Sequence, residues 1–164
     1  MKGSIWKAVG IVTALCLLSV TAVAAGGADL VAVRAATSRF HSVKVAQAAK
    51  YEPFLDCLAD PLGTGAMGFH YLNSGTVDLT IDALHPEAMV YAPGPQEGQR
   101  QLGAVEYIVP AAAWDAAGNT QPPSLFGETF LFDPDFGTYE LHVWMYISNP
   151  SGLFAPWNPR VTCP

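Results

Sequence analysis

The feature that most constrains the fold is a series of short β-prone runs, separated by glycine and proline, that follows Cys57. Each run is rich in β-branched and aromatic residues, which favour strands, and the gaps are rich in turn formers. The predicted strands are GFHYL (68–72), PEAMVYA (86–92), QLGAVEYIV (101–109), ETFLF (128–132) and TYELHVWMYI (138–147). The loop APGPQEGQR joins the second and third runs and predicts that they pair antiparallel.

Helical patterns come before these runs. Apolar residues recur at helical spacing from Ala28 onward, and Ser42 can begin a second helix that ends before Pro53. One kinked helix or two separate helices would satisfy this pattern. Residues 111–124 read as an irregular surface connection. Because helices precede strands, we predict an α+β domain with N-terminal helices packed on an antiparallel, possibly barrel-like, sheet.

The first residues read as an export signal. Lys2 and Lys7 flank the start of an uncharged apolar run, and Ala22-Val23-Ala24 fits the site that signal peptidase cleaves. An uncleaved membrane anchor is the alternative, but the run is shorter than the roughly 20 residues that a bilayer requires. We therefore predict a signal peptide at 1–24, a single α+β domain at 25–164, and a secreted or periplasmic location without a membrane span after cleavage.

Charge narrows the classes of partner. Without Lys2 and Lys7, six basic residues remain against fourteen acidic ones, so the formal charge falls from −6 to −8. An acidic domain without a basic patch is a poor partner for nucleic acid, because phosphate contacts supply most of that affinity. The expected partner is a metal ion or a small molecule. The sequence does not indicate an oligomeric state.

Two cysteines remain once Cys16 is removed with the signal peptide. In an oxidising compartment Cys57 and Cys163 are expected to form one disulfide. The bond would close a loop of about 100 residues, for which chain entropy predicts roughly 4–5 kcal/mol of stabilisation. It would also hold the C-terminal segment in place.

Alternation along TYELHVWMYI places a histidine among aromatic residues. Thr138, Glu140, His142, Trp144 and Tyr146 share one face of this predicted strand. A face that carries these side chains is either covered or lines a pocket.

Two other strands carry similar groups. His70 lies in GFHYL, and Glu106 is predicted to share its face with Leu102, Ala104 and Ile108. A carboxylate among aliphatic side chains is costly to bury unless it is paired, protonated or bound to a cation. We therefore predict that His70, Glu106 and His142 converge.

Two imidazoles and a carboxylate suit Zn, Cu, Fe or Mn. His41 and Glu140 are candidates for an additional ligand or a supporting role. In the alternative interpretation, both histidines are ordinary buried residues bonded to the backbone, and Glu106 is bonded to a tyrosine. No dense motif such as His-Glu-x-x-His distinguishes the two interpretations.

The C-terminal segment NPSGLFAPWNPR is rich in proline and aromatic residues. Phe154 and Trp157 could line a ligand pocket together with Trp144 and Tyr146, or the segment could be a clamp over the last strand. FDPDFG (132–137) reads as a turn, and Glu87 reads as surface charge. We predict an exported protein that binds a metal ion or small ligand under an aromatic cover. The alternatives are a metal-dependent enzyme of unknown substrate and a structural or interaction protein of the cell envelope without metal.

Three stretches, MGFHYLN, VEYIVP and HVW…NPSGLFAPWNP…C, resemble a family of small exported bacterial proteins without an assigned function, which share MGxHY, VEYxVP and HVW…NPxGxFAPWNPxVxC. The similarity runs from about Thr37 to Cys163. It implies one intact domain and includes His70, Glu106 and His142 in the recurring pattern. It also leads us to expect glycine at the position that Lys50 occupies here.

Overall fold

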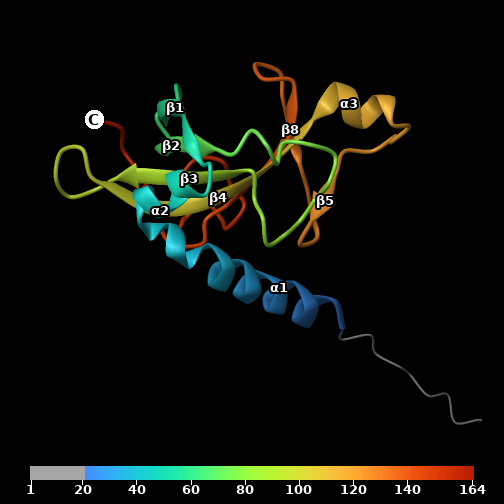
Figure 1. Cartoon of the computed structure of the whole chain (residues 1–164), viewed down its shortest axis with the longest axis horizontal. Coiled ribbons are helices and arrows are strands. Elements are labelled where there is room, and N and C mark those ends of the chain that lie inside the picture. Colours follow the sequence, from blue (N-terminus) through green and yellow to red (C-terminus); the bar gives the residue numbers. More distant parts are fainter. Residues whose placement is uncertain (1–20) are drawn as a thin grey trace, which may run out of the picture.

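The computed structural model describes residues 21–164, with side chains from residue 29 onward (Figure 1). The predicted signal peptide, residues 1–24, lies almost entirely outside the described residues. The helices are α1 (Thr21–Thr37), the 3-10 turn η1 (Ser38–His41), α2 (Val43–Ala48) and α3 (Ala111–Ala116). The strands are β1 (Glu52–Ala59), β2 (Ala66–Leu72), β3 (Ala88–Pro93), β4 (Arg100–Pro110), β5 (Ser124–Leu125), β6 (Glu128–Thr129), β7 (Leu131–Asp133) and β8 (Thr138–Val143). Within the described residues, no helix is long and apolar enough to span a bilayer.

The main sheet is antiparallel and six-stranded, in the order β1-β2-β3-β4-β8-β7, and β5 and β6 form a separate hairpin. The sheet curls into a half-barrel, and Figure 1 shows α1 and α2 on one side of it. The α+β class, the antiparallel sheet and the pairing of β3 with β4 are confirmed. The predicted irregular connection at 111–124 was wrong in part, because it contains the short helix α3.

The predicted strands differ from the observed ones in three places. β1 was missed, because Pro53 suggested only a helix end, yet an edge strand tolerates proline near its start. ETFLF is split by the buried Phe130 into β6 and β7. β8 ends at Val143, so residues 144–147, which were predicted to continue the strand, lie outside it.

The end of α2 explains the glycine that the family resemblance leads us to expect at Lys50. Lys50 has a positive φ of 72°, in the left-handed region that glycine adopts without strain. The Lys50 N–H bonds to the Gln47 carbonyl at 2.9 Å, and the Tyr51 N–H bonds to the Ala46 carbonyl at 3.0 Å. This is the Schellman arrangement, in which glycine is the preferred residue.

One face of the sheet, which we call the helix face, packs against the N-terminal helices. Its core contains Val33 and Phe40 from the helical segments, together with Met89, Tyr91, Leu102, Val105, Tyr107, Leu141 and Val143 from the strands. The Tyr91 hydroxyl donates to the Phe40 carbonyl at 2.7 Å, so a polar bond also fixes the helical segment to the sheet. This face is a closed core.

A bulge at Gly103 overturns one predicted assignment. Val90 pairs with Ala104, but Tyr91 pairs with Leu102, so β4 has one extra residue at this point. Leu102 therefore points into the helix face, while Ala104 and Glu106 point to the other side. Leu102 does not share a face with Glu106, as the alternation had predicted.

The opposite face, which we call the tail face, is covered by the C-terminal segment. Ala66, Val90, Ala92, Ala104, Trp144 and Val161 form its apolar cluster. The Trp144 indole donates to the Ala155 carbonyl at 2.7 Å, and Asn158 forms an isolated bridge with Ala66. The predicted clamp over the last strand is therefore observed.

The glycines of GTGAMG allow this close packing. A Cβ at Gly65 would collide with the Asn158 carbonyl, and one at Gly68 would collide with the Tyr91 carbonyl. Both glycines have positive φ values, 136° and 116° respectively. The glycine-rich stretch therefore serves backbone packing.

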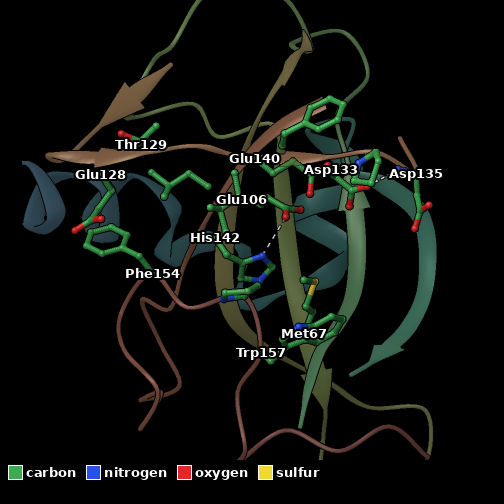
Figure 2. A pocket seen from close by; sticks show the side chains of 15 residues that line it. Met67, Glu106, Glu128, Thr129, Asp133, Asp135, Glu140, His142, Phe154 and Trp157 are labelled. Carbon is green, nitrogen blue, oxygen red and sulfur yellow. Dashed lines mark hydrogen bonds and ion pairs between the residues drawn. The ribbon is translucent and has the colours of Figure 1, made fainter. Parts of the chain in front are cut away.

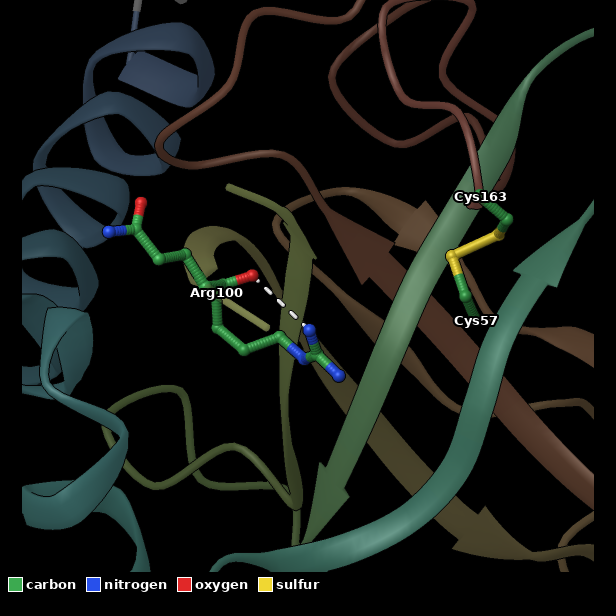
Figure 3. The surroundings of a disulfide bond; sticks show 4 residues. Cys57, Arg100 and Cys163 are labelled. Atoms are coloured by element: carbon green, nitrogen blue, oxygen red, sulfur yellow. Dashed lines mark hydrogen bonds between the residues drawn. A yellow bond between two sulfur atoms is a disulfide. The ribbon is translucent and has the colours of Figure 1, made fainter. Parts of the chain in front are cut away.

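The disulfide between Cys57 and Cys163 joins the end of the C-terminal segment to β1, as predicted (Figure 3). Its Cα–Cα distance is 5.6 Å, within the ordinary range for a disulfide. The segment leaves β8 and is covalently held at the opposite edge of the sheet. The segment from the end of β8 to Cys163, which we call the strap, therefore closes the tail face, whereas helices close the helix face.

Candidate metal centre

Strand pairing brings the three predicted side chains together on the tail face. Glu106 of β4 lies directly opposite His142 of β8. On its other side Glu106 pairs with Ala88 of β3, and His70 of β2 pairs with Val90 of the same strand. Because Ala88 has a small side chain, the histidine of β2 can reach Glu106 across β3.

The polar atoms of the three residues lie close together. His142 Nδ1 is 3.0 Å from Glu106 Oε1, and His70 Nε2 is 3.5 Å from Glu106 Oε2. One ligand atom from each residue lies within 4.8 Å of the other two. Figure 2 shows the bond between His142 and Glu106 on neighbouring strands. We call these three residues the triad.

All three side chains are buried, and burial sets their protonation. Burial lowers the pKa of His70 and is the largest influence on it; the charge of Glu106 and the Gly68 carbonyl act in the opposite direction. Burial also lowers the pKa of His142 to about 4, opposed by the charge of Glu140. Both imidazoles are therefore neutral at neutral pH, which is the form that binds metal ions.

Burial acts in the opposite direction on Glu106. It raises the pKa of this carboxyl, and the charge of Asp133 raises it further, while His70 lowers it. Since neither histidine carries a positive charge at neutral pH, Glu106 has no full counter-charge among its hydrogen-bonding partners. The carboxyl is therefore held in an environment that favours an added cation or a proton.

The outer nitrogens of both rings also lack partners. His70 Nδ1 and His142 Nε2 are buried and make no hydrogen bond of ordinary geometry. Buried polar atoms usually have a hydrogen-bond partner, so buried ring nitrogens without one need an explanation. Arg100 Nε is the third such atom among the described residues, and its guanidinium lies over the Phe69 ring.

Glu140 lies next to the triad without belonging to it. Its Oε1 accepts a hydrogen bond from the Thr138 hydroxyl at 2.5 Å. Burial, together with the charge of Glu106, raises its pKa to about 7. Its carboxyl lies beside the three candidate ligands, and the supporting role of Glu140 stays a prediction.

Two neighbouring pockets adjoin the triad, and because they share lining residues we call them the two lobes of one cavity. The larger lobe, of about 570 Å³, is lined by His70, Glu106 and mainly apolar residues between β1 and the β7–β8 turn. The smaller lobe, of about 330 Å³, is lined by Glu106 and His142 and lies under the C-terminal segment (Figure 2). Glu106, Glu140, Asp133, Asp135, Met67 and Trp157 line both lobes.

The two edges of the half-barrel approach each other at the larger lobe. Phe54 of β1 and Phe136 of the β7–β8 turn have ring centroids 5.9 Å apart. Both side chains line this lobe, and both are about half exposed. The cavity is thus the interior of a curled sheet that is closed at its seam by aromatic side chains.

Three predicted site residues lie elsewhere. Tyr146 packs on the helix face, where its hydroxyl contacts Thr37, and His41 stacks edge-on against Tyr146 at 4.6 Å. Both are separated from the triad by the sheet: Tyr146 because the alternation of β8 stops at Val143, and His41 because it ends η1 among the N-terminal helices. Trp144 is on the predicted face, but it is buried under the C-terminal segment and does not line the cavity. Phe154 and Trp157 do line it, as predicted.

Sequence reasoning also missed members of the site. Asp133 and Asp135 lie in the predicted turn, and both line the cavity. No local signal could have found this, because β1 forms the opposite wall. Glu87 was wrongly predicted as surface charge: it is 3% exposed, and its Oε2 accepts a hydrogen bond from the Ile108 N–H at 3.0 Å. The continuous apolar run of β3 begins directly after Glu87 and could have indicated its burial.

Comparisons with known proteins add no relative: no family model, no curated protein and no solved structure matches this chain.

Proposed function

We propose that this protein is exported and binds one divalent transition-metal ion, with His70, Glu106 and His142 as ligands. The observation that carries the proposal is the triad itself: three buried metal-binding side chains from β2, β4 and β8, with ligand atoms within 4.8 Å of one another. Among the described residues, no other group of three or more histidine, cysteine or acidic side chains is this close.

The spacing of the ligand atoms supports the proposal. In a tetrahedral site with metal–nitrogen and metal–oxygen bonds of about 2.0–2.1 Å, neighbouring ligand atoms are about 3.3 Å apart. The two nitrogen–oxygen distances, 3.0 Å to Oε1 and 3.5 Å to Oε2, are close to this value, although they run to different oxygens of Glu106. With one ligand atom from each residue, the separations extend up to 4.8 Å, so the ligands would have to draw together around an ion. A metal ion can therefore replace the direct contacts of Glu106 after small side-chain movements.

The charges support a cation as well. Glu106 and Glu140 are both shielded from water, and Asp133 adds to the negative potential at Glu106. A divalent ion would provide the positive charge that the neutral imidazoles do not. Metal binding would stabilise the ionised form of both carboxyls and remove the cost of burying them unpaired.

The donor set limits the metal and its chemistry. Two imidazoles and one carboxylate suit Zn²⁺, Fe²⁺, Cu²⁺ and Mn²⁺, and three protein ligands leave at least one coordination position open. A bound ion would act there as a Lewis acid. The chain's own contribution is to hold the ligands rigidly on three paired strands, beside a cavity that can admit a small molecule. This cavity is the observation that favours a metal-dependent enzyme as a second candidate.

An exported location is also part of the proposal. The disulfide is compatible with an oxidising compartment, since such bonds are rare in reducing cytosol. In the competing interpretation, the protein is a structural or interaction protein, and Glu106 is simply a protonated carboxyl between two histidines. That interpretation predicts no stoichiometric metal.

The test is element analysis of the full chain, expressed with its own N-terminus, without a histidine tag, and purified from the exported fraction. We expect about one equivalent of a transition metal. His70→Ala and His142→Ala should each lose that metal while keeping the far-ultraviolet circular dichroism of the parent protein.

His85→Ala is the matched control. His85 is exposed and bonds to Asp82 rather than to the triad, so its replacement should leave the metal content unchanged. Metal-free parent protein that gains no thermal stability on addition of Zn²⁺, Cu²⁺, Fe²⁺ or Mn²⁺ would contradict the proposal.

A further inference from the structure

Three carboxylates remain near the triad after the candidate ligands are assigned. Asp133, Asp135 and Glu140 line both lobes of the cavity, but none belongs to the ligand group. No Lys or Arg lines either lobe, and within residues 29–164 no ion pair includes Asp133 or Asp135. The cavity therefore carries uncompensated negative charge, which attracts cations and repels anions.

The larger lobe is also apolar. Its wall includes Leu55, Leu58, Leu72, Val77 and Ile108. A volume of about 570 Å³ falls within the usual range for small-molecule sites, which are mostly apolar with a few placed polar groups. A bare inorganic ion would leave this apolar space unfilled, so the occupant has an apolar body.

Aromatic rings lie at the seam where the charge and the apolar wall meet. Phe54 and Phe136 form the closure between β1 and the β7–β8 turn, and Trp157 lines both lobes. Aromatic faces attract organic cations, and Trp does so most strongly. His70, which is 3% exposed, also lines the larger lobe, so this apolar wall includes a buried polar side chain.

From these observations we propose that the cavity binds a small organic ammonium ion, whose apolar body fills the larger lobe and whose cationic head lies among Asp133, Asp135 and Glu140. The inference rests on the cavity and not on the metal. It does not require a metal ion, because Asp133 and Asp135 are not ligands of the triad. A divalent ion at the triad would reduce the negative charge near Glu140, so the amine should bind more tightly to the metal-free protein.

Three probes with the same apolar body separate the effect of charge from that of shape: 4-phenylbutylamine, 4-phenylbutan-1-ol and 4-phenylbutyrate. Isothermal titration at pH 7 is done on chelator-treated protein and on protein loaded with one equivalent of Zn²⁺. We expect the amine to bind at least about tenfold more tightly than the alcohol, and the carboxylate to bind most weakly. Raising the salt concentration should weaken the amine far more than the alcohol, since only the amine gains from screened charges.

Substitutions of the acidic residues test where the ammonium group of the amine binds. Asp133→Asn with Asp135→Asn should lower the affinity for the amine about tenfold, a change equal to one charge-assisted contact, without affecting the alcohol. Asparagine can still accept the backbone hydrogen bonds that Asp133 receives from Asp135 and Phe136. Glu97→Gln is the control for a charge lost away from the cavity, because Glu97 is exposed in the β3–β4 loop outside it; this replacement removes one of the two charges that the double variant removes.

A second variant locates the apolar body. Val77→Trp should fill part of the larger lobe and weaken the amine and the alcohol together, while metal content stays unchanged.

Three results would overturn the inference. The first is an alcohol that binds as tightly as the amine, and the second is an amine affinity unchanged by the Asp133 and Asp135 substitutions. The third is 4-phenylbutyrate binding most tightly and only to Zn²⁺-loaded protein, which would mean that the cavity serves an open metal position. Element analysis of untreated protein decides the metal proposal separately.

Discussion

The two faces of the main sheet treat buried polar groups differently. On the helix face, three tyrosine hydroxyls donate to backbone carbonyls (Tyr51 to Pro86, Tyr91 to Phe40 and Tyr107 to Ala83). On the tail face, His70 and His142 each keep a buried ring nitrogen without a partner, beside a carboxyl without a full counter-charge. On the helix face, the fold itself satisfies these tyrosine hydroxyls. The triad on the tail face has no comparable set of partners, which is why we propose a function there.

The largest expected effect comes from the strap that closes the tail face. Cys57→Ser with Cys163→Ser opens a loop with a sequence separation of 106, and chain entropy predicts a loss of about 4–5 kcal/mol in unfolding free energy. Urea unfolding of the oxidised parent and of the variant measures the difference. The reduced parent protein should match the variant. Equal stabilities of all three samples would show that the strap contributes nothing.

On the helix face, Leu102→Ala should cost about 3 kcal/mol of unfolding free energy, because it leaves a cavity in a closed core. Leu102 is fully buried there as a result of the bulge at Gly103. Leu131→Ala is the control, since Leu131 is 60% exposed and its truncation should have little effect. Similar losses for the two variants would contradict the position of Leu102 in the core.

A buried carboxyl outside the triad provides a pH-dependent test. Burial raises the pKa of Glu87 to about 7, opposed by the Ile108 N–H. Because the folded-state pKa lies above the ordinary value of 4.5, the stability associated with Glu87 is full below pH 4.5 and is lost as pH rises through 7. The loss is about 3 kcal/mol at most.

Unfolding free energies of the parent and of Glu87→Gln, measured from pH 4 to pH 8, isolate this effect. Glutamine keeps an acceptor for the Ile108 N–H and removes the charge, so the variant should show a flatter profile. Glu97→Gln, at an exposed position, should leave the profile of the parent unchanged. Parallel profiles for the parent and Glu87→Gln would refute the raised pKa.

On the tail face, Glu106→Gln separates stability from binding. In metal-free protein we expect a change of less than about 1 kcal/mol in unfolding free energy. Both imidazoles are neutral, so replacing Glu106 by glutamine leaves no buried charge without a partner. The parent should gain about 2.7 kcal/mol at a metal concentration of 100 times Kd, and the variant should not. Thermal unfolding with and without metal makes the comparison. A large loss in the metal-free variant would favour a purely structural triad.

The smallest expected effect concerns the end of α2. Lys50→Gly should stabilise the fold by about 1 kcal/mol, since it removes the steric cost of a side chain in the left-handed conformation. Lys44→Gly, in the first turn of α2, should instead destabilise the fold, by up to about 1 kcal/mol. Urea unfolding shows whether each substitution raises or lowers the unfolding free energy. A lower unfolding free energy for both variants would mean that Lys50 is not strained.

Sequence reasoning succeeded where a local rule was sufficient. Period-two alternation placed His142 correctly within β8, and the cost of burying a carboxylate among aliphatic residues pointed to Glu106. It failed where long-range packing overrides the local pattern. The bulge at Gly103 reverses Leu102, and the chain after Val143 bends away from the strand, so that Tyr146 reaches the helices instead of the cavity. Asp133 and Asp135 could not be assigned, since the wall opposite them belongs to β1, which was itself missed.

The path of the strap has a consequence for biogenesis. Cys57 lies on the first strand, and its partner is at position 163, beyond every other strand of the sheet. The native cross-link can therefore form only after the chain from β2 to β8 has been synthesised and position 163 is accessible. Until then the Cys57 thiol has no native partner. Oxidation of this pair would thus report that every strand between the two cysteines is in place.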